Sequence, residues 1–554
     1  MSYVPPTAEQ RFVLDHIARI GELVDDHDLV DAVVEGAGAF AAGYYAPLSR
    51  LGDTVGARWS GGQVTMPAGF HEAYAALVDG GWGSIGAPEE FGGQGLPYCL
   101  ATVLMEDLGS ANMGFSLINM LTPGAIEALY SHGAAELQAA YLPKLVSGEW
   151  NGTMCLTEPQ AGSDVGALRS QATPAGDGSW RITGSKIFIT FGEHDLTKNV
   201  IHLVLARTPG APAGPKGISL FLVPKYRLDA NGGPGEFNDV RCTGIEQKLG
   251  IHASPTCMMS FGDTGDCHGW LIGAENEGMR CMFTMMNNAR LNVGLQGVQV
   301  AEAASQRAVA YARDRVQFGK PIIAQPDVRR MLLRMRSLTQ AARGLIYYAA
   351  GQADRASAGD QEARARLGLL TPLAKAWGTD VGCDVASLGV QVHGGMGFIE
   401  ETGAAQHYRD IRIAPIYEGT NCIQAADLVG RKLGGETLAI LLSEMKADCV
   451  GEPNLAELIE AVGIVAQWMA SAAPEDRLAG SYPFLTMLSV AVGGWLMARQ
   501  GAAAADLDSP FGEIKRASVR FFLDIIVAEA LGLKAGATAG AGALNAVSLD
   551  AFAA

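Results

Sequence analysis

The feature that most constrains the fold of this chain is a change of hydrophobic period near residue 150. From 151 to 272 the apolar residues form short runs rich in β-branched, aromatic and aliphatic side chains. Turn signals separate the runs, including Asp177-Gly178 in an expected hairpin. No helix-length stretch intervenes, so an antiparallel barrel or sandwich fits better than a parallel α/β sheet. The expected strands are 150–156, 180–182, 186–190, 200–206, 218–223 and 257–261.

Helical patterns flank this block on both sides. One helix is expected over 279–313 and a second from Gln325, with Pro326 in its first turn. A third is expected over 371–392, with Pro372 in its first turn, and a fourth just after Glu418. Four helices in succession predict an antiparallel bundle.

The predicted fold class is α+β, mostly α, because 554 residues exceed one ordinary domain. The expected domains are an N-terminal helical domain (1–150), a middle antiparallel β-barrel or sandwich (151–272), a four-helix bundle (273–432) and an additional C-terminal helical domain (433–554).

Composition excludes several classes of protein. A content of 48% hydrophobic and 18% charged residues is typical of a well-buried globular chain. The net charge of -17 argues against nucleic acid as a partner, although a local basic pocket can still bind an anion. The longest apolar run, 484–498, falls short of the ~18 residues of a membrane span, so we expect a buried helix and no membrane insertion.

Cysteine and histidine usage indicates a reduced, metal-free protein. The nine cysteines are scattered without a CxxC pair, which is typical of a cytosolic protein with free thiols. The ten histidines form no HxxxH or HExxH pattern, so no metal is expected. The N-terminus lacks a signal or transit pattern, and we expect a cytoplasmic protein.

Three short stretches place glycine and small polar residues where a backbone could approach a bound group. They are 156–164, which holds Leu-Thr-Glu-Pro and Ala-Gly-Ser-Asp, then 391–398 (QVHGGMGF) and 417–420 (YEGT). The last adds Glu418, a carboxylate placed like a general base. The alternative is structural, because Thr420 and Asn421 can cap the next helix and an acid is favoured near a helix N-terminus.

Other candidate binding residues also have structural alternatives. The hydroxyls of Thr157, Ser163 and Thr190 could bind a polar ring edge, or simply end a strand. The corner 315–320 could hold a phosphate, or be an ordinary helix C-terminus. Arg290, three residues after Asn287, could bind a phosphate or pair with an acid. The GxGxxG match at 81–86 is rejected as a dinucleotide site, because helix-like sequence precedes it and Ala87-Pro88 follows.

The order and separations of these stretches, from about residue 75 to 430, resemble the acyl-CoA dehydrogenase family. The resemblance implies FAD between the β-domain and the bundle. Residues expected to contact the isoalloxazine and pyrophosphate are Leu156, Thr157, Ser163, Phe188 and Thr190, with Thr420 also assigned to the cofactor. The neighbouring subunit would bind the adenosine diphosphate with Arg315, Phe318, Gln325, Gln391 and Gly395. Phe188 stands where the family usually has Trp.

The resemblance also implies the reaction. Glu418 would remove the α-proton of an acyl-CoA, flavin N5 would take the β-hydride, and the product would be a trans-2-enoyl-CoA. Tyr417 would border the thioester, while Arg290 and Asn287 would bind the CoA. Electrons would pass to an electron-transfer flavoprotein. The alternatives are an acyl-CoA oxidase that uses oxygen and a non-enzymatic DNA-binding branch, against which the net charge argues.

The segment after residue 432 points to the long bacterial branch of the family. That branch includes 3-methylmercaptopropionyl-CoA dehydrogenases and broad-range fatty acyl-CoA dehydrogenases, of DMSP degradation and fatty acid metabolism. The resemblance implies a homodimer, because the segment would cover the face that shorter members use to form tetramers. The acyl group stays open between a sulfur-containing C3 chain and a short, medium or branched one.

Overall fold

The computed structural model describes residues 3–554, which divide into two compact units. One unit comprises residues 36–289, and the other comprises 3–35 together with 290–554. The four predicted domains are thus distributed over two units, and residues 3–35 group with the later part of the chain. The predicted fold class, α+β and mostly α, is confirmed.

The unit of residues 36–289 begins with helices, as predicted, and with one small hairpin that was not predicted. Helix α6 packs on strand β3 so closely that a Cβ atom at Gly152 would lie 2.5 Å from that of Ala125. The segment at 81–86 follows helix α4 and forms a 3-10 turn, so the dinucleotide motif is absent from it. The elements are α3 (Ser49–Thr54), β1 (Arg58–Ser60), β2 (Gln63–Thr65), α4 (Phe70–Asp79), α5 (Tyr98–Ser116), α6 (Ile118–His132) and α7 (Ala135–Val146).

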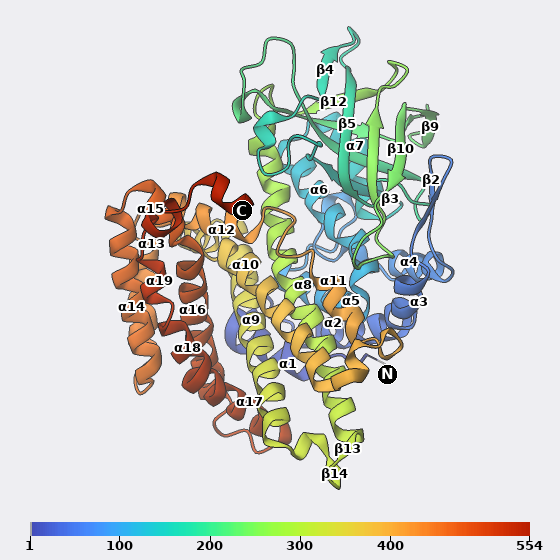
Figure 1. Cartoon of the computed structure of the whole chain (residues 1–554). Coiled ribbons are helices and arrows are strands. Elements are labelled where there is room, and N and C mark those ends of the chain that lie inside the picture. The colour runs from blue at the N-terminus through green and yellow to red at the C-terminus, as the bar shows by residue number, and fades with distance from the viewer. Residues whose placement is uncertain (1–2) are drawn as a thin grey trace. The chain divides into compact units, whose positions relative to one another are not determined.

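An eight-stranded sheet follows, in the order β10-β11-β5-β12-β7-β6-β3, with β4 paired to β5. Several of its strands are labelled in Figure 1. The expected hairpin at Asp177-Gly178 joins β4 to β5. Strands β8 and β9 form a separate hairpin. The strands are β3 (Trp150–Cys155), β4 (Gln171–Pro174), β5 (Trp180–Thr190), β6 (Asn199–Ala206), β7 (Ser219–Pro224), β8 (Tyr226–Leu228), β9 (Pro234–Phe237), β10 (Val240–Ile245), β11 (Thr256–Phe261) and β12 (His268–Ile272).

Two predictions about the sheet were wrong. Strands β3 and β6 are parallel, whereas a wholly antiparallel sheet was expected. Both strands are buried along their whole length, and continuous burial is typical of parallel pairs. The expected strands 180–182 and 186–190 form one strand, because Gly184 and Ser185 keep their pairing with β11.

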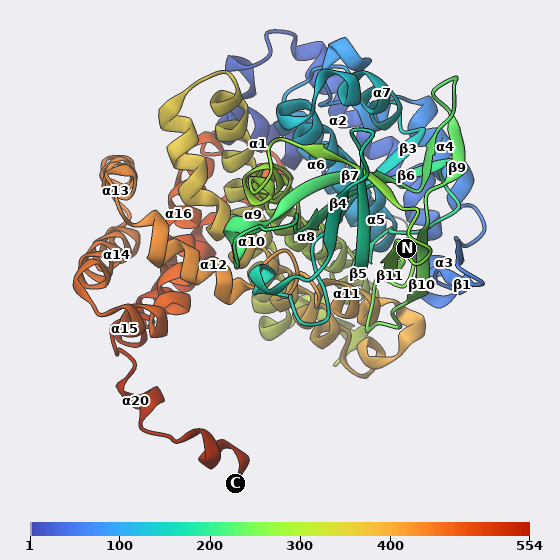
Figure 2. The ribbon, with the colours of Figure 1, turned by 90° about the horizontal axis from the view of Figure 1, so that it is seen from above.

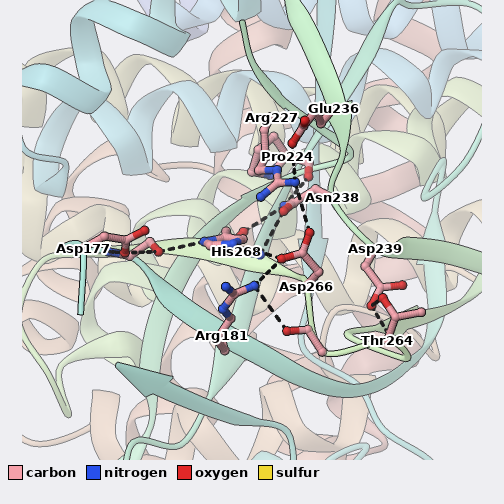
Figure 3. A network of polar contacts seen from close by, with 12 residues as sticks. Asp177, Arg181, Pro224, Arg227, Glu236, Asn238, Asp239, Thr264, Asp266 and His268 are labelled. Carbon is pink, nitrogen blue, oxygen red and sulfur yellow. Dashed lines mark hydrogen bonds and ion pairs between the residues drawn. The ribbon is translucent and has the colours of Figure 1, made fainter. Parts of the chain in front are cut away.

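A polar network fastens several strands together at one side of the sheet. Figure 3 shows Asp266 between the guanidinium groups of Arg181 on β5 and Arg227 on β8. Beside them, the Asn238 amide donates to the carbonyl oxygens of Pro224 and His268, both at 2.8 Å. The network therefore ties β5, β7, β8 and β12 to the turn before β10.

The second unit contains most of the predicted bundle, although residues 278–289 at the start of its first helix belong to the other unit. Helices α8, α9 and α10 are long, and α9 and α10 run side by side (Figure 1). Helices α8 and α10 touch through their backbones, since a Cβ atom at Gly297 would lie 1.8 Å from the carbonyl oxygen of Gly378. The elements are α8 (Gly278–Asp314), β13 (Val316–Gln317), β14 (Lys320–Pro321), α9 (Pro326–Ser357), α10 (Gln361–His393), α11 (Ala404–Ile411) and α12 (Asn421–Asp427).

Two helix predictions in the bundle need correction. Helix α10 begins at Gln361, where the Asp360 carboxylate accepts hydrogen bonds from the N–H groups of Glu362 and Ala363. Pro372 therefore lies inside the helix, where packing on both sides outweighs the cost of a proline. Helix α12 is short, and α11 before it was not predicted.

Residues 433–554, called here the C-terminal extension, are helical as expected. The expected apolar run lies in α16, which is longer than predicted. Its 23 residues are long and apolar enough to cross a membrane, but 78% of its 18-residue apolar segment is buried inside the structure. From α20 the chain runs out from the other helices (Figure 2). The helices are α13 (Thr437–Asp448), α14 (Pro453–Ser471), α15 (Pro474–Ala479), α16 (Ser481–Ala503), α17 (Pro510–Phe521), α18 (Val527–Leu531), α19 (Lys534–Ala537) and α20 (Gly542–Asn545).

A buried charge cluster joins the first helix, α1 (Thr7–Val13), to the bundle and the extension. The Lys515 ammonium on α17 lies 2.5 Å from a carboxylate oxygen of Glu9. The Arg343 guanidinium on α9 lies 2.8 Å from Glu302 on α8 and 3.9 Å from Glu9. All four side chains are at most 4% exposed, so each charge depends on its partners. Helix α2 (His27–Phe40) follows α1.

Candidate active site

Glu418 lies in a strained loop between α11 and α12, residues 412–420, called here the Glu418 loop. Its φ is +56°, in the left-handed region that costs a non-glycine residue about 1–2 kcal/mol. Backbone bonds hold the turn: the N–H groups of Ile416 and Tyr417 donate to the Ile413 carbonyl at 2.9 and 3.2 Å. Such strain persists only where the surroundings impose it, and it is common at functional sites.

The end of the loop also caps helix α12. The Thr420 hydroxyl accepts a hydrogen bond from the N–H of Ile423 at 3.2 Å. The Gln424 amide donates to the carbonyl of Gly419 at 3.3 Å. The structural alternative for this motif is therefore real for Thr420, which caps α12.

The surroundings of Glu418 suit a general base. Burial raises the pKa of its carboxyl from 4.5 to about 7, although the cations Arg290 and Lys375 favour the ionised form. A base with a pKa near the working pH is partly ionised and still accepts a proton strongly.

Arg290, on α8, is buried among acids. Its side chain is 8% exposed, and Asp427 and Glu418 are the acids that act on its charge. A Cβ atom added to Gly419 would lie 3.7 Å from the Arg290 guanidinium. This position suits an electrostatic partner of the Glu418 loop better than a ligand for an exposed phosphate.

Tyr417 is held by a second residue of α8. Its hydroxyl donates a short hydrogen bond to the side-chain oxygen of Gln296, which is 2% exposed. Burial raises the pKa of the Tyr417 hydroxyl far above its usual value, so the ring stays neutral beside Glu418. Asn287 also lies on α8 and is exposed.

Beneath the Glu418 loop lies Lys375, on α10. Its fully buried ammonium donates to the carbonyl of Ala414 at 3.0 Å and to the side-chain oxygen of Asn421 at 2.9 Å. Burial lowers the pKa of Lys375 to about 7. One side chain therefore anchors both ends of the loop that carries Glu418.

In the other unit, a buried ion pair holds the loop 156–164. The Lys186 ammonium lies 2.8 Å from the Glu158 carboxylate and donates to the carbonyl of Leu156 at 3.0 Å. The same carboxylate accepts from the N–H groups of Arg169 and Ser170. Burial opposes ionisation, but Lys186 and these donors lower the pKa of Glu158 to about 2. The loop is thus fixed by a permanent charge pair.

Strand β5 presents an exposed aromatic ring beside this loop. Phe188 has a φ of +61° at a register shift opposite β11, and its side chain is 57% exposed. The N–H of Ile187 donates to the Thr157 carbonyl at 2.9 Å, which brings Thr157 next to Phe188. Thr190 is partly buried two residues further on, and Ser163 is exposed in the loop. The predicted residues Leu156, Thr157 and Phe188 are therefore brought together.

The residues expected to bind from a neighbouring subunit lie on two separate elements. Arg315 and Gln325 flank the β13–β14 hairpin, where the Ile322 N–H donates to the Arg315 carbonyl. Phe318, at the tip, is 92% exposed with a φ of +52°. Gln391 and Gly395 are exposed at the end of α10.

Comparison with known proteins identifies the chain. Models of the acyl-CoA dehydrogenase N-terminal, middle and C-terminal domains match residues 35–149, 153–264 and 276–433. The model "Acetyl-CoA dehydrogenase C-terminal like" matches 452–548. The chain belongs to the acyl-CoA dehydrogenase family.

Individual members of the acyl-CoA dehydrogenase family resemble this chain along most of its length. The 3-methylmercaptopropionyl-CoA dehydrogenase of Ruegeria pomeroyi is 44% identical over 96% of this chain and 97% of its own. A butyryl-CoA dehydrogenase of Syntrophomonas wolfei is 35% identical over 88% and 87%. The crystal structure of a Bacillus anthracis acyl-CoA dehydrogenase complexed with FAD has the same fold, with a TM-score of 0.77, 22% identity and coverage of 93% and 88%.

This acyl-CoA dehydrogenase therefore belongs to a family that uses FAD, and the residues of the β-domain fit a flavin. The backbone of Phe188 is left-handed, and its ring, which is 57% exposed, offers a flat apolar face. The hydroxyls of Thr157 and Ser163 beside it offer uncharged hydrogen-bonding groups, and Gly162 has open space around its Cα. These features suit an aromatic ring system with a polar edge.

Sequence reasoning missed Lys375 and Gln296 in the acyl-CoA dehydrogenase site. Lys375 interrupts the apolar stretch Leu373-Ala374 and Ala376-Trp377 inside a helix. A lone charge at a core position requires a partner, and this was the available signal. Gln296 lies in a helix of mixed polarity and offered no such signal.

Proposed function

We propose that this protein desaturates an acyl-CoA thioester to the trans-2-enoyl-CoA, with Glu418 as the base that removes the α-proton. One observation supports this assignment above all. A partly buried carboxylate, with a pKa near 7, is held in left-handed backbone conformation beside two buried cations.

The residues around Glu418 have separate parts in the proton transfer. The carboxylate accepts the proton as the α C–H bond breaks. Arg290 and Lys375 keep enough of the carboxylate ionised to act as a base near neutral pH. We also assign the backbone N–H of Glu418 a role in catalysis. It would donate a hydrogen bond to the thioester oxygen and stabilise the negative charge that develops there. Tyr417 borders the thioester as a neutral ring.

FAD, when bound, accepts the β-hydrogen as hydride, which leaves the new double bond between the α and β carbons. We propose that Leu156, Thr157, Ser163, Phe188 and Thr190 hold the flavin. Each turnover would leave two electrons on the cofactor, and we propose an electron-transfer flavoprotein as their acceptor.

We propose a short acyl chain as the substrate, with 3-methylmercaptopropionyl-CoA as the first compound to test. The support is the 44% identity to a dehydrogenase of that name over nearly the whole of both chains, and the 35% identity to a butyryl-CoA dehydrogenase. The two acyl groups differ by a thioether, so both fit one class of short, flexible, apolar chain.

We also propose a cytoplasmic homodimer. Phe318 and Phe398 are 92% and 86% exposed, and Val316, Met396 and Ile399 are half exposed. These residues lie in the same two elements as Arg315, Gln325, Gln391 and Gly395, which are expected to bind adenosine diphosphate for the partner subunit. Exposed aromatic residues of this size are typical of a surface that another chain covers.

An anaerobic titration of the FAD-loaded protein with a panel of acyl-CoAs tests the activity. Bleaching of the flavin by 3-methylmercaptopropionyl-CoA or butyryl-CoA is expected, and Glu418→Gln should slow it by about 10²- to 10⁴-fold. Glu401→Gln, at an exposed position, is the matched control and should bleach like the wild type. A yellow protein that no acyl-CoA bleaches would contradict the proposal. Release of hydrogen peroxide in air, without a protein acceptor, would instead indicate an oxidase.

A further inference from the structure

We propose that Tyr482, on helix α16 of the C-terminal extension, is a positioning residue that holds the Glu418 loop through a chain of buried hydrogen bonds. The inference rests on the proposed function, because it concerns the residue assigned there as the base. It gives the extension a part in the reaction, although none of the proposed catalytic or cofactor-binding residues lies beyond residue 432.

The chain begins at Asn421, the first residue of α12. Its backbone N–H donates to the carbonyl of Pro415 at 2.9 Å and so closes the loop around Glu418. Its side-chain oxygen accepts from the Lys375 ammonium at 2.9 Å, and Lys375 also holds the Ala414 carbonyl. The position of the Asn421 side chain therefore sets both ends of the segment that carries the base.

The amide of Asn421 reaches into α10. It donates to the hydroxyl of Thr379 at 3.0 Å, to the carbonyl of Ala376 at 3.1 Å and to a carboxylate oxygen of Asp380 at 2.9 Å. Asn421 is 4% exposed, so its amide and oxygen both depend on these protein partners. The bond to Asp380 is the one that leads toward the C-terminal extension.

Tyr482 completes the chain from the other side. Its hydroxyl donates to the second carboxylate oxygen of Asp380 at 2.6 Å, across 102 residues of sequence. Burial raises the pKa of Asp380 to about 6, while the hydrogen bonds from Tyr482 and Asn421 favour its carboxylate. Without Tyr482, Asp380 would lose one donor and hold its proton to higher pH.

That loss would be transmitted to Glu418 through charge as well as position. A carboxylate at Asp380 favours the ammonium form of Lys375, and the ammonium favours the carboxylate of Glu418. The other charged group acting on Glu418 is Arg290, which is itself influenced by Asp427 and Arg431. Removing the Tyr482 hydroxyl should therefore raise the pKa of Glu418.

The test measures removal of the α-proton separately from hydride transfer. The FAD-loaded protein is incubated in D₂O with 3-thiabutyryl-CoA, which has exchangeable α-protons but sulfur in place of the β-carbon, so it cannot be desaturated. Mass spectrometry measures α-proton exchange from pH 5.5 to 9. Tyr482→Phe is expected to lower the rate at neutral pH about threefold to tenfold, the factor that one hydrogen bond corresponds to, and to move the midpoint upward.

The matched control is Tyr348→Phe. Tyr348, on α9, packs edge-on against Trp495 of α16, and its hydroxyl accepts from Arg366, away from the Glu418 loop. Its exchange rate and midpoint should stay within twofold of the wild type. If both variants slow exchange equally, the effect belongs to general packing and the inference is overturned.

Asp380→Asn provides a second variant, because an amide keeps the shape and one acceptor but not the charge. It should shift the midpoint in the same direction as Tyr482→Phe, with melting temperatures recorded for all proteins. Unchanged exchange in both Tyr482→Phe and Asp380→Asn would overturn the inference while the proposed function stands. A wild type that exchanges no α-protons would overturn the proposed function itself.

Discussion

Lys186 and Glu158 form a buried ion pair at 2.8 Å, under the loop that carries Thr157 and Ser163. Both side chains are at most 4% exposed. The Glu158 carboxylate also accepts the N–H groups of Arg169 and Ser170, so it joins the start of the loop to the segment that follows the loop. The shape of the proposed flavin site therefore depends on a buried ion pair beneath the loop.

Glu158→Gln should lower the stability of the protein and its hold on FAD. Loss of the carboxylate leaves the Lys186 ammonium buried without a counter-charge, at a cost of about 3–5 kcal/mol. The measurements are the melting temperature and the FAD content after gel filtration. Glu149→Gln, which breaks a partly exposed pair with Lys144, should change stability by less than about 1 kcal/mol. Equal effects of the two variants would contradict the role of burial.

The reaction should depend on pH with a midpoint near 7. Glu418 acts as a carboxylate, and burial raises its pKa to about 7, so the rate of flavin reduction should rise with pH and level off above about pH 8. The contribution of the Glu418 carboxyl to folding stability changes with pH in the opposite direction. A carboxyl whose pKa is higher in the folded than in the unfolded state favours folding most below pH 4.5, and this contribution is lost as pH rises through 7. Stopped-flow absorbance across pH 5.5–9 measures the first effect; a midpoint near 4.5 would contradict it.

Lys375→Met should move that midpoint upward and lower the rate at pH 7. The substitution removes a positive charge that favours the Glu418 carboxylate, and it removes the donor to Ala414 and Asn421. Loss of these hydrogen bonds should also cost about 1–3 kcal/mol of stability. Lys375→Arg, which keeps the charge, should retain a lower midpoint than Lys375→Met. The same stopped-flow profile and a thermal melt separate the two effects.

Gly419→Ala should impair the reaction more than it impairs folding. Gly419 has a φ of +83°, where an L-residue is destabilised by about 1–2 kcal/mol, and an added Cβ atom would lie 2.8 Å from the Gln424 amide. Relief of this contact must move the segment next to Glu418. Gly430→Ala, near the same helix and with open space around it, is the control. The two variants are compared by melting temperature and by kcat with the best acyl-CoA.

Some parts of this architecture could be predicted from the sequence, and others could not. The β-rich block, the long helix of Arg290 and the Gln325 start of α9 follow from local pattern and turn chemistry. The early start of α10 was missed because tertiary packing outweighs the signal of Pro372. The parallel pairing of β3 with β6 depends on contacts between strands 49 residues apart, for which a local pattern holds no information.

The candidate site shows the same division. Glu418 and Tyr417 could be found because their motif is continuous along the chain. The role of Lys375 could not, since it depends on the carbonyl of Ala414, 39 residues later, being brought over α10. The left-handed backbone at Glu418 was equally hidden, because glycine or asparagine is the usual sign of that conformation.

Lys515→Met should destabilise the protein strongly without changing the pH midpoint of the reaction. The substitution leaves the Glu9 carboxylate, 4% exposed, without its nearest cation, at a cost of about 3–5 kcal/mol. Lys534→Met, at an exposed position of the extension, is the control and should melt like the wild type. Limited proteolysis should cut the first helix sooner in Lys515→Met than in the control.

The partners Glu9 and Lys515 are separated by 506 residues of chain. A ribosome that adds roughly 5–20 residues per second needs on the order of 25–100 s to pass from one to the other. Throughout that interval the first helix has left the ribosome while the lysine that neutralises its buried acid has not been made. Residues 36–289 are synthesised entirely within this delay. Helix α1 therefore emerges long before the residue that completes its packing is made.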